Sequence, residues 1–153
     1  GAKLRREYST VLGASEMTLL DLTTMYSVIW NNGRSVRHYS ITKITAPDGK
    51  ILYERNPSDS IQLLNASTVN YMGELLSDVI KPNGTGHRAS APGVLGGKTG
   101  TSNGNRDAWF IGSTNDLTIG VWVGNDDFTP MNNKITGGTV PAEIFKGIVT
   151  SIQ

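Results

Sequence analysis

The sequence predicts an α+β fold in which helices flank an antiparallel β-sheet. Residues 94–124 hold three strand-like runs separated by short turn sequences, which is typical of an antiparallel meander. Three other segments repeat apolar residues at the spacing of one helix face. With 153 residues, 37% of them hydrophobic, the chain is long enough to bury a core of its own. We therefore expect one domain, or part of a larger one.

The composition excludes several classes of function. There is no cysteine, which removes disulfides, thiol nucleophiles and thiolate metal sites. The net charge is +1 and the 14 lysines and arginines are scattered, so we expect no nucleic-acid partner. No run approaches the roughly 20 apolar residues of a membrane span, and the start at Gly1 lacks the layout of a signal peptide. We expect no membrane contact by this segment itself, and any targeting segment upstream of it.

The first helix is predicted by a cap and a periodic run. Thr18 and Asp21 have the spacing of a capping box, and apolar residues follow at helical spacing. We expect a helix from about Leu19 to Trp30. Residues 37–54 then hold two strand-like runs around an Ala-Pro-Asp-Gly turn sequence, which predicts a peripheral β-hairpin.

Two more helices are expected. Ser67 can cap one whose apolar residues share a face; it should pack on a sheet and end before Pro82. The other follows Thr139, has Pro141 in its first turn and closes the chain. Between them we expect three strands, over residues 94–101, 107–112 and 117–124, and then a polar loop over residues 126–138.

The first of these strands contains the most informative motif, Gly-Gly-Lys-Thr-Gly-Thr-Ser at residues 96–102. Because side chains alternate along a strand, Lys98 and Gly100 should lie on one face, and Thr99 and Thr101 on the other. The glycines permit close approach of a ligand to a lysine and two hydroxyls. Lys-Thr-Gly alone also fits a surface turn with a solvated lysine, so the surrounding sequence decides between the two interpretations.

The segments around the motif occur in a characteristic order. An Asp-Ala-Trp-Phe strand, a Gly-Val-Trp-Val-Gly strand, Thr-Gly-Gly and Pro-Ala follow it, and Leu-Gly-Ala-Ser-Glu and Gly-Thr-Gly precede it. They lie at residues 107–110, 120–124, 136–138, 141–142, 12–16 and 84–86. From about Tyr8 to Ile148, this order resembles that of class A penicillin-binding proteins. The resemblance implies part of a serine β-lactamase/transpeptidase-like fold.

The family resembled works through a Ser-x-x-Lys nucleophile, a Ser-x-Asn element and the Lys-Thr-Gly strand together. The resemblance implies that a serine is acylated by the D-Ala-D-Ala end of a peptidoglycan stem peptide, and that an amine of a neighbouring stem resolves the ester. β-Lactams mimic the donor peptide. No cofactor and no metal are expected.

Residue roles follow from the resemblance. Lys98 and Thr101 would be catalytic: the lysine would help to hold the substrate carboxylate and the proton network, and the Thr101 N–H would be half of the oxyanion hole. The hydroxyls of Thr99 and Thr101 would bind the substrate carboxylate, and a side chain at Gly100 would crowd the ligand. The implied substrate-binding residues are Thr99, Gly100, Thr101 and Ser102.

Two further matches to the family's motifs are rejected. Ser40 and Lys43 fit Ser-x-x-Lys, but the pair needs one helical turn to meet, and these residues lie in a strand-like run. Ser113-Thr114-Asn115 fits Ser-x-Asn, but it follows the Lys-Thr-Gly strand instead of preceding it and occupies a turn. Both functional elements should therefore lie upstream of Gly1.

Other candidates carry less weight. Residues 92–99 nearly spell a phosphate-binding loop, but Pro92 replaces its first glycine and a strand follows. His38 and His87 are far apart and are interpreted as solvated loop residues. Trp30, Trp109 and Trp122 are interpreted as core residues. Asp107 could pair with Arg106 or Lys98, or only mark a turn, and no role is assigned to it.

Residues 1–153 are thus expected to be the C-terminal portion of a penicillin-binding transpeptidase domain whose catalytic serine lies upstream. The isolated chain should be inactive. The parent would act in cell-wall synthesis and cell shape at the extracytoplasmic face of the bacterial inner membrane, in the periplasm, anchored by an upstream transmembrane helix. Its partners would be peptidoglycan stem peptides, β-lactam antibiotics and the upstream half of the same domain.

Two alternatives stay open. One is a non-catalytic penicillin-recognising sensor or interaction domain, which the absence of a helical Ser-x-x-Lys upstream would favour. The other is a related carboxypeptidase or β-lactamase, which differs in how water reaches the acyl-enzyme. The class A-like strands at residues 107–110 and 120–124 favour the transpeptidase.

Overall fold

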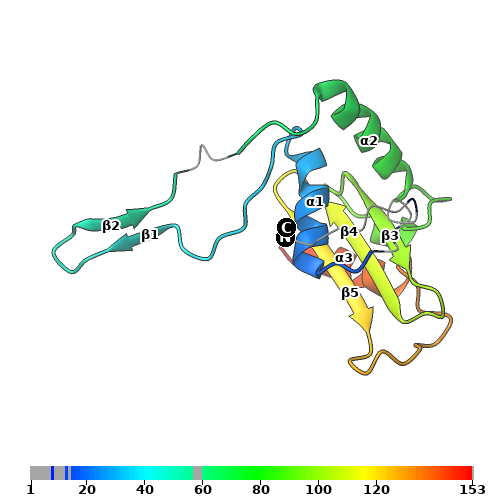
Figure 1. Cartoon of the computed structure of the whole chain (residues 1–153). Coiled ribbons are helices and arrows are strands. Elements are labelled where there is room, and N and C mark those ends of the chain that lie inside the picture. The colour runs from blue at the N-terminus through cyan, green and yellow to red at the C-terminus, as the bar shows by residue number, and fades with distance from the viewer. Residues whose placement is uncertain (1–7, 9–12, 14, 57–59, 153) are drawn as a thin grey trace.

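The computed structural model (Figure 1) describes residues 8, 13, 15–56 and 60–152. It has the expected α+β class, with one three-stranded sheet, one hairpin and three α-helices in the part of the chain described. In chain order the elements are α1 Leu19–Trp30, β1 Lys43–Thr45, β2 Ile51–Glu54, α2 Ala66–Asp78, the 3₁₀ helix η3 His87–Ala89, β3 Gly96–Thr101, β4 Asp107–Ser113, β5 Thr118–Gly124 and α3 Val140–Ser151.

The central sheet is an antiparallel meander in the order β3-β4-β5. Gly96 pairs with Ser113 and Thr101 with Ala108, while Asp107 pairs with Gly124 across the other edge of β4. The three expected strands are therefore confirmed, with shifts of one or two residues at their ends. This strand order puts β3 at the edge of the sheet.

The core lies between the sheet and α3. The rings of Phe110 on β4 and Phe145 on α3 are 5.0 Å apart, and both side chains are fully buried. Gly112 makes this approach possible, because a β-carbon there would lie 2.6 Å from the Phe145 ring. Burial of each such side chain contributes about 1.5–3 kcal/mol. Val149 and Ala142 of α3 complete the buried face.

Two helices cover the opposite face of the sheet (Figure 1). α1 packs mainly on β5, where Gly120 lies so close that a β-carbon would collide with the Thr23 hydroxyl. α2 packs on β3 through Leu76, whose backbone lies 2.8 Å from the position of a β-carbon on Gly96. The sheet is thus held between α3 on one side and α1 with α2 on the other.

The two predicted caps have different outcomes. The Thr18 hydroxyl accepts a hydrogen bond from the Asp21 N–H at 3.1 Å, which confirms the cap of α1. The predicted cap of α2 is wrong, because Asn65 and not Ser67 precedes the helix. Asn65 Oδ1 accepts from the Thr68 N–H at 2.8 Å, and the Ser67 hydroxyl donates to the same oxygen. The helix η3 was not predicted, since three residues carry no periodic signal.

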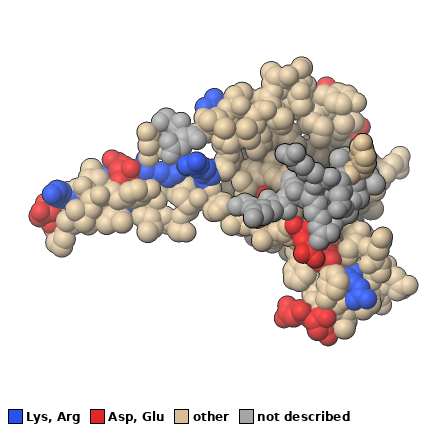
Figure 2. Space-filling model, in the orientation of Figure 1, with Lys and Arg blue, Asp and Glu red and all other residues tan. Residues whose placement is uncertain are grey.

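The β1–β2 hairpin projects from the body of the molecule (Figure 1). Among the described residues its strands pair only with each other, with Lys43 opposite Glu54 and an ion pair of 3.2 Å between them. Gly49 has a φ of 85° in the connecting turn, a conformation that favours glycine. Figure 2 shows charges of both signs along this arm. Among the described residues, no helix has the length and apolar character to cross a membrane.

Candidate active site

The Lys-Thr-Gly motif occupies the edge strand of the sheet, with one edge of β3 unpaired among the described residues. The Ser102 N–H donates to the Asp107 carbonyl across the β3–β4 turn at 3.0 Å. Alternate residues of an antiparallel strand direct their backbone groups to the same side. The N–H groups of Lys98 and Gly100 therefore point toward β4, and those of Thr99 and Thr101 point toward the open edge.

Lys98 brings a cation to this open edge. Its side chain is exposed, and Nζ donates a hydrogen bond of 2.6 Å to the carbonyl oxygen of Thr99. That carbonyl lies on the open side of β3, so the ammonium group is held beside the unpaired backbone of the strand. A cation and free N–H donors in one place can bind an anionic ligand.

The two threonines of the motif lie on the face opposite Gly100, as alternation predicts. A β-carbon on Gly100 would contact Trp109 on one face, whereas the Thr101 hydroxyl accepts from the Gly137 N–H at 3.0 Å on the other. The Thr99 hydroxyl lies 2.9 Å from the Thr85 hydroxyl. A hydroxyl has one hydrogen and two acceptor positions, so the Thr101 hydrogen remains available to a further acceptor.

Ser102 closes the turn at the end of β3. Its hydroxyl accepts the Asp107 N–H at 2.8 Å, and its own N–H is bonded to the Asp107 carbonyl. Ser102 therefore lies beside the other motif residues, but its hydroxyl is hydrogen-bonded within the β3–β4 turn. Gly100 has more room: the nearest atom to an added β-carbon is Trp109 Cβ at 3.4 Å, an ordinary contact.

Three residues outside the Lys-Thr-Gly motif contact β3 or the loop that packs on it. Thr85 and Gly137 contact the threonine face directly, and Asn105 binds the loop that leads to Gly137. The Gly-Thr-Gly and Thr-Gly-Gly sequences were available as signals, because paired glycines indicate close backbone approach. Asn105 had no such signal.

The two rejected motifs lie away from this edge. Lys43 is in the hairpin, where it pairs with Glu54, and the segment from Ser40 is not helical. Ser113 is buried at the end of β4, and its hydroxyl donates within the β4–β5 turn, with oxygens of Thr114 and Leu117 at 3.0 and 2.9 Å. Both have local structural explanations.

The interpretation of the three tryptophans as core residues is wrong, because Trp30 and Trp109 are only partly buried and Trp122 is exposed. The Trp122 side chain is 36% exposed, and Nε1 donates to the Asp107 carboxylate at 3.0 Å. Asp107 thus pairs with a tryptophan and not with Arg106 or Lys98. Trp122 lies opposite Trp109 in the sheet, two residues before the end of β5. His38 and His87 are both exposed, and the described residues contain no cluster of three potential metal ligands.

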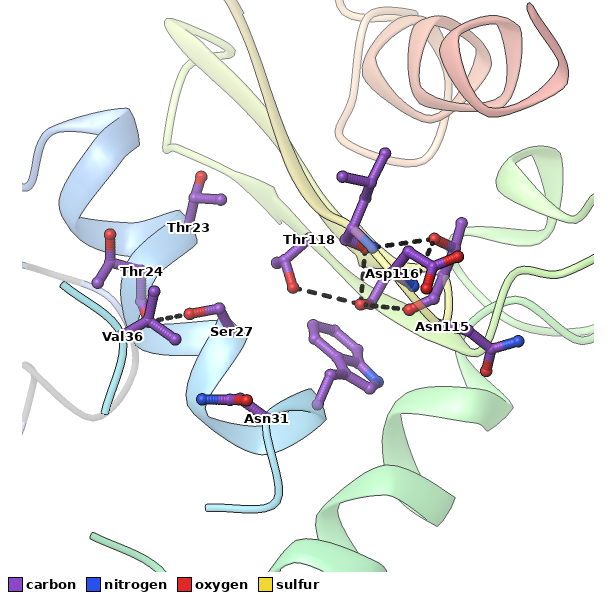
Figure 3. A pocket seen from close by; sticks show the side chains of 12 residues that line it. Thr23, Thr24, Ser27, Asn31, Val36, Asn115, Asp116 and Thr118 are labelled. Carbon is purple, nitrogen blue, oxygen red and sulfur yellow. Dashed lines mark hydrogen bonds between the residues drawn. The ribbon is translucent and has the colours of Figure 1, made fainter. Parts of the chain in front are cut away.

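A separate cavity of about 320 Å³, lined by both polar and apolar side chains, lies between α1 and the β4–β5 turn (Figure 3). Thr23, Thr24 and Ser27 line its α1 side, and Asn115 and Asp116 line its turn side. The three α1 hydroxyls donate to helix carbonyls at 2.7 Å. Neither a lysine nor a histidine is among the described residues that line it.

Comparisons with known proteins agree on one family. A family profile described as "Penicillin binding protein transpeptidase domain" matches residues 4–151. Penicillin-binding protein 1A of Rickettsia bellii is 31% identical over 92% of the chain, and penicillin-binding protein 4 of Bacillus subtilis is 43% identical over 72%. The chain spans about a fifth of the length of these curated relatives, 21% and 18% respectively.

Solved structures give the same fold. Penicillin-binding protein 3 of Mycobacterium tuberculosis, complexed with aztreonam, superposes with a TM-score of 0.67 at 30% identity, over 89% of this chain and 34% of that one. PonA1 of the same organism, in complex with penicillin V, reaches a TM-score of 0.81 over 95% of this chain and 41% of that one. At 21% identity, the second likeness shows the fold alone.

Proposed function

This chain belongs to the penicillin-binding protein transpeptidase family, and from that membership we propose that it forms one wall of the active site of a serine D-Ala-D-Ala transpeptidase. The observation that carries the proposal is the open edge of β3. There Lys98 Nζ, the unpaired N–H of Thr101 and the Thr101 hydroxyl lie within four consecutive residues of one strand, 98–101. Pairing with β4 along the other edge holds β3 in place.

The chemistry divides into two transfers. The hydroxyl oxygen of a serine outside this chain attacks the carbonyl carbon of the penultimate D-Ala. The peptide C–N bond then breaks, and the terminal D-Ala leaves with the proton. An amine of a second stem peptide attacks the resulting ester, so that a new amide forms and the serine is released. A β-lactam acylates the serine in the same way: the serine oxygen attacks the lactam carbonyl carbon, the lactam C–N bond breaks, and the ring nitrogen takes the proton but stays attached to the opened ligand.

The motif residues would stabilise negative charge, both on the attacked carbonyl oxygen and on the ligand carboxylate. The Thr101 N–H would donate to the oxyanion that develops at the attacked carbonyl, which is worth on the order of 3 kcal/mol of barrier. Lys98, with the hydroxyls of Thr99 and Thr101, would bind the terminal carboxylate of the substrate or of a β-lactam. Gly100 would leave room for the ligand, and Ser102 would fix the end of the strand through its bond to Asp107.

The nucleophile is proposed to lie in a segment that precedes residue 1, so that residues 1–153 are the C-terminal portion of the domain. The one Ser-x-x-Lys sequence in the chain, at residues 40–43, is in the hairpin arm and not on a helix. We further propose that the whole protein is held at the extracytoplasmic face of the inner membrane by a transmembrane helix outside this chain. Stem peptides and the upstream half of the domain would be its partners there.

The test is labelling with a fluorescent penicillin, followed by intact mass measurement and peptide mapping, on the full-length protein and on residues 1–153. We expect the full-length protein to gain one adduct, on a serine outside residues 1–153, and the isolated chain to gain none. An adduct on Ser40 would show that the rejected motif is the nucleophile. No adduct on a folded full-length protein would favour a non-catalytic sensor, and rapid release of the adduct would favour a β-lactamase or carboxypeptidase.

A further inference from the structure

The loop between β5 and α3 returns to the β3 strand and contacts its threonine face. Gly137 is buried there, and its N–H donates to the Thr101 hydroxyl at 3.0 Å. The loop fits this closely only without a side chain, since a β-carbon on Gly137 would lie 2.5 Å from the Gly100 oxygen and 2.7 Å from its nitrogen. The next residue, Gly138, packs equally closely against the carbonyl of Thr85.

This contact sets the direction of the Thr101 hydroxyl. Because one acceptor position of the oxygen takes the Gly137 N–H, the hydroxyl hydrogen is left for a different partner. Thr101 is exposed, and no acceptor for its hydrogen lies among the described residues. The hydroxyl is therefore arranged as a hydrogen-bond donor toward whatever binds beside β3.

Asn105 holds the loop that carries Gly137. Its Nδ2 donates to the Ile135 carbonyl at 2.9 Å and, more weakly, to the Asn133 carbonyl at 3.4 Å, while its backbone carbonyl accepts from the Met131 N–H at 2.9 Å. Asn105 has a φ of 53°, a conformation that asparagine adopts more readily than most residues. One residue of the β3–β4 turn thus binds three points of the returning loop.

We propose that Asn105 and the Gly137 N–H are positioning residues that make the Thr101 hydroxyl a donor to the carboxylate of the ligand. This inference rests on the proposed function, in which Thr101 meets the carboxylate of a stem peptide or a penicillin. Asn105 fixes the loop, the loop presents the Gly137 N–H, and that N–H orients Thr101. Neither residue touches the reacting atoms.

The test uses the full-length protein and two ligands, benzylpenicillin and its methyl ester, which lacks the carboxylate. Asn105→Gly removes the side-chain amide but keeps a residue that adopts positive φ. We expect this variant to be acylated by benzylpenicillin roughly tenfold more slowly, as is typical for the loss of a hydrogen bond to a charged group. Acylation by the ester should change little, so the acid-to-ester ratio of rate constants should fall by about the same factor.

Four further variants, one of them a double variant, separate positioning from general stability. Asn103→Gly is the matched control, because Asn103 lies exposed in the same turn and no hydrogen bond of its side chain is recorded in the described structure; its ratio should equal the wild-type ratio. Thr101→Val should lower the ratio, and Thr101→Ser should retain it. Adding Asn105→Gly to Thr101→Val should lower the ratio no further, since both act through one hydroxyl.

The outcomes distinguish this inference from the proposed function. If Thr101→Val lowers the acid-to-ester ratio and Asn105→Gly leaves it unchanged, the positioning role is wrong and the proposed function stands. If Asn105→Gly slows both ligands equally and lowers the melting temperature, Asn105 is only structural and the inference also fails. If wild-type protein forms no serine adduct with benzylpenicillin, the proposed function fails and this inference fails with it.

Discussion

At the scale of single residues, the glycines of β3 serve different purposes. A β-carbon on Gly97 would lie 2.5 Å from the Phe110 ring and 2.8 Å from the Ile111 oxygen, whereas one on Gly100 would meet its nearest atom at 3.4 Å. Gly97→Ala should therefore lower the free energy of unfolding by about 1–3 kcal/mol through overpacking. Gly100→Ala should change it by less than about 0.5 kcal/mol. Denaturant unfolding of both variants checks this, and equal losses would contradict it.

Lys98 offers a second prediction at this scale. Its side chain is exposed and, within the described part of the chain, hydrogen-bonds only to the neighbouring Thr99 carbonyl, so its removal should not affect stability. Lys98→Ala should slow penicillin acylation of the full-length protein by about 10²-fold or more, as is typical for the loss of a group that transfers protons or binds charge in the transition state. Lys134→Ala is the control, because Lys134 is an exposed lysine of the β5–α3 loop. Similar rates for both variants would remove Lys98 from the site.

At the scale of elements, two residues at the start of α2, Asn65 and Ser67, are candidates for its N-cap. Asn65 accepts the Thr68 N–H, while the Ser67 hydroxyl only donates to Asn65. Asn65→Ala should lower the free energy of unfolding by about 1 kcal/mol, the usual effect of losing an N-cap. Ser67→Ala should have a smaller effect. Thermal or denaturant unfolding distinguishes them, and a larger loss for Ser67→Ala would restore the cap predicted from sequence.

Tyr26, in the helix α1, makes the stability of the folded protein depend on pH. Burial raises the pKa of Tyr26 above its ordinary value of 10.0. The folded protein therefore keeps the phenol proton at a pH where the unfolded chain releases it. Stability is fully present below the ordinary pKa and falls as the pH rises through and above it. Tyr26→Phe should make this alkaline loss of stability shallower, which unfolding measurements between about pH 9 and 11 would detect.

At the scale of the whole molecule, the hairpin arm is structurally separate from the sheet that carries the motif. β1 and β2 pair with each other alone, and Figure 1 shows them projecting from the body. Replacing residues 40–55 of the full-length protein with a short Gly-Ser linker should leave the rate of penicillin acylation unchanged. The same change removes Ser40 and Lys43. Loss of labelling without loss of fold would show that the arm contributes to the site.

The sequence alone determined the elements whose signals are local. Leu19–Trp30 is helical as its apolar spacing predicts, and the three strands of the central sheet follow their turn sequences. Alternation along β3 assigned Lys98 and Gly100 to one face and the two threonines to the other, and the contacts agree. Of the segments that carried the family resemblance, Leu12 and Ala14 lie outside the described residues. These features could be predicted because each depends on neighbours within a few residues.

Only the tertiary structure decided which distant residues meet at β3. Thr85 and Gly137 reach the threonine face from two other segments, Asn105 binds the loop that carries Gly137, and Trp122 is 36% exposed although it lies in an apolar run. Gly137 reaches Thr101 across 36 residues of sequence. Periodicity describes the geometry of one element, whereas contacts between elements depend on how their faces pack, and the packing exists only once the chain has folded.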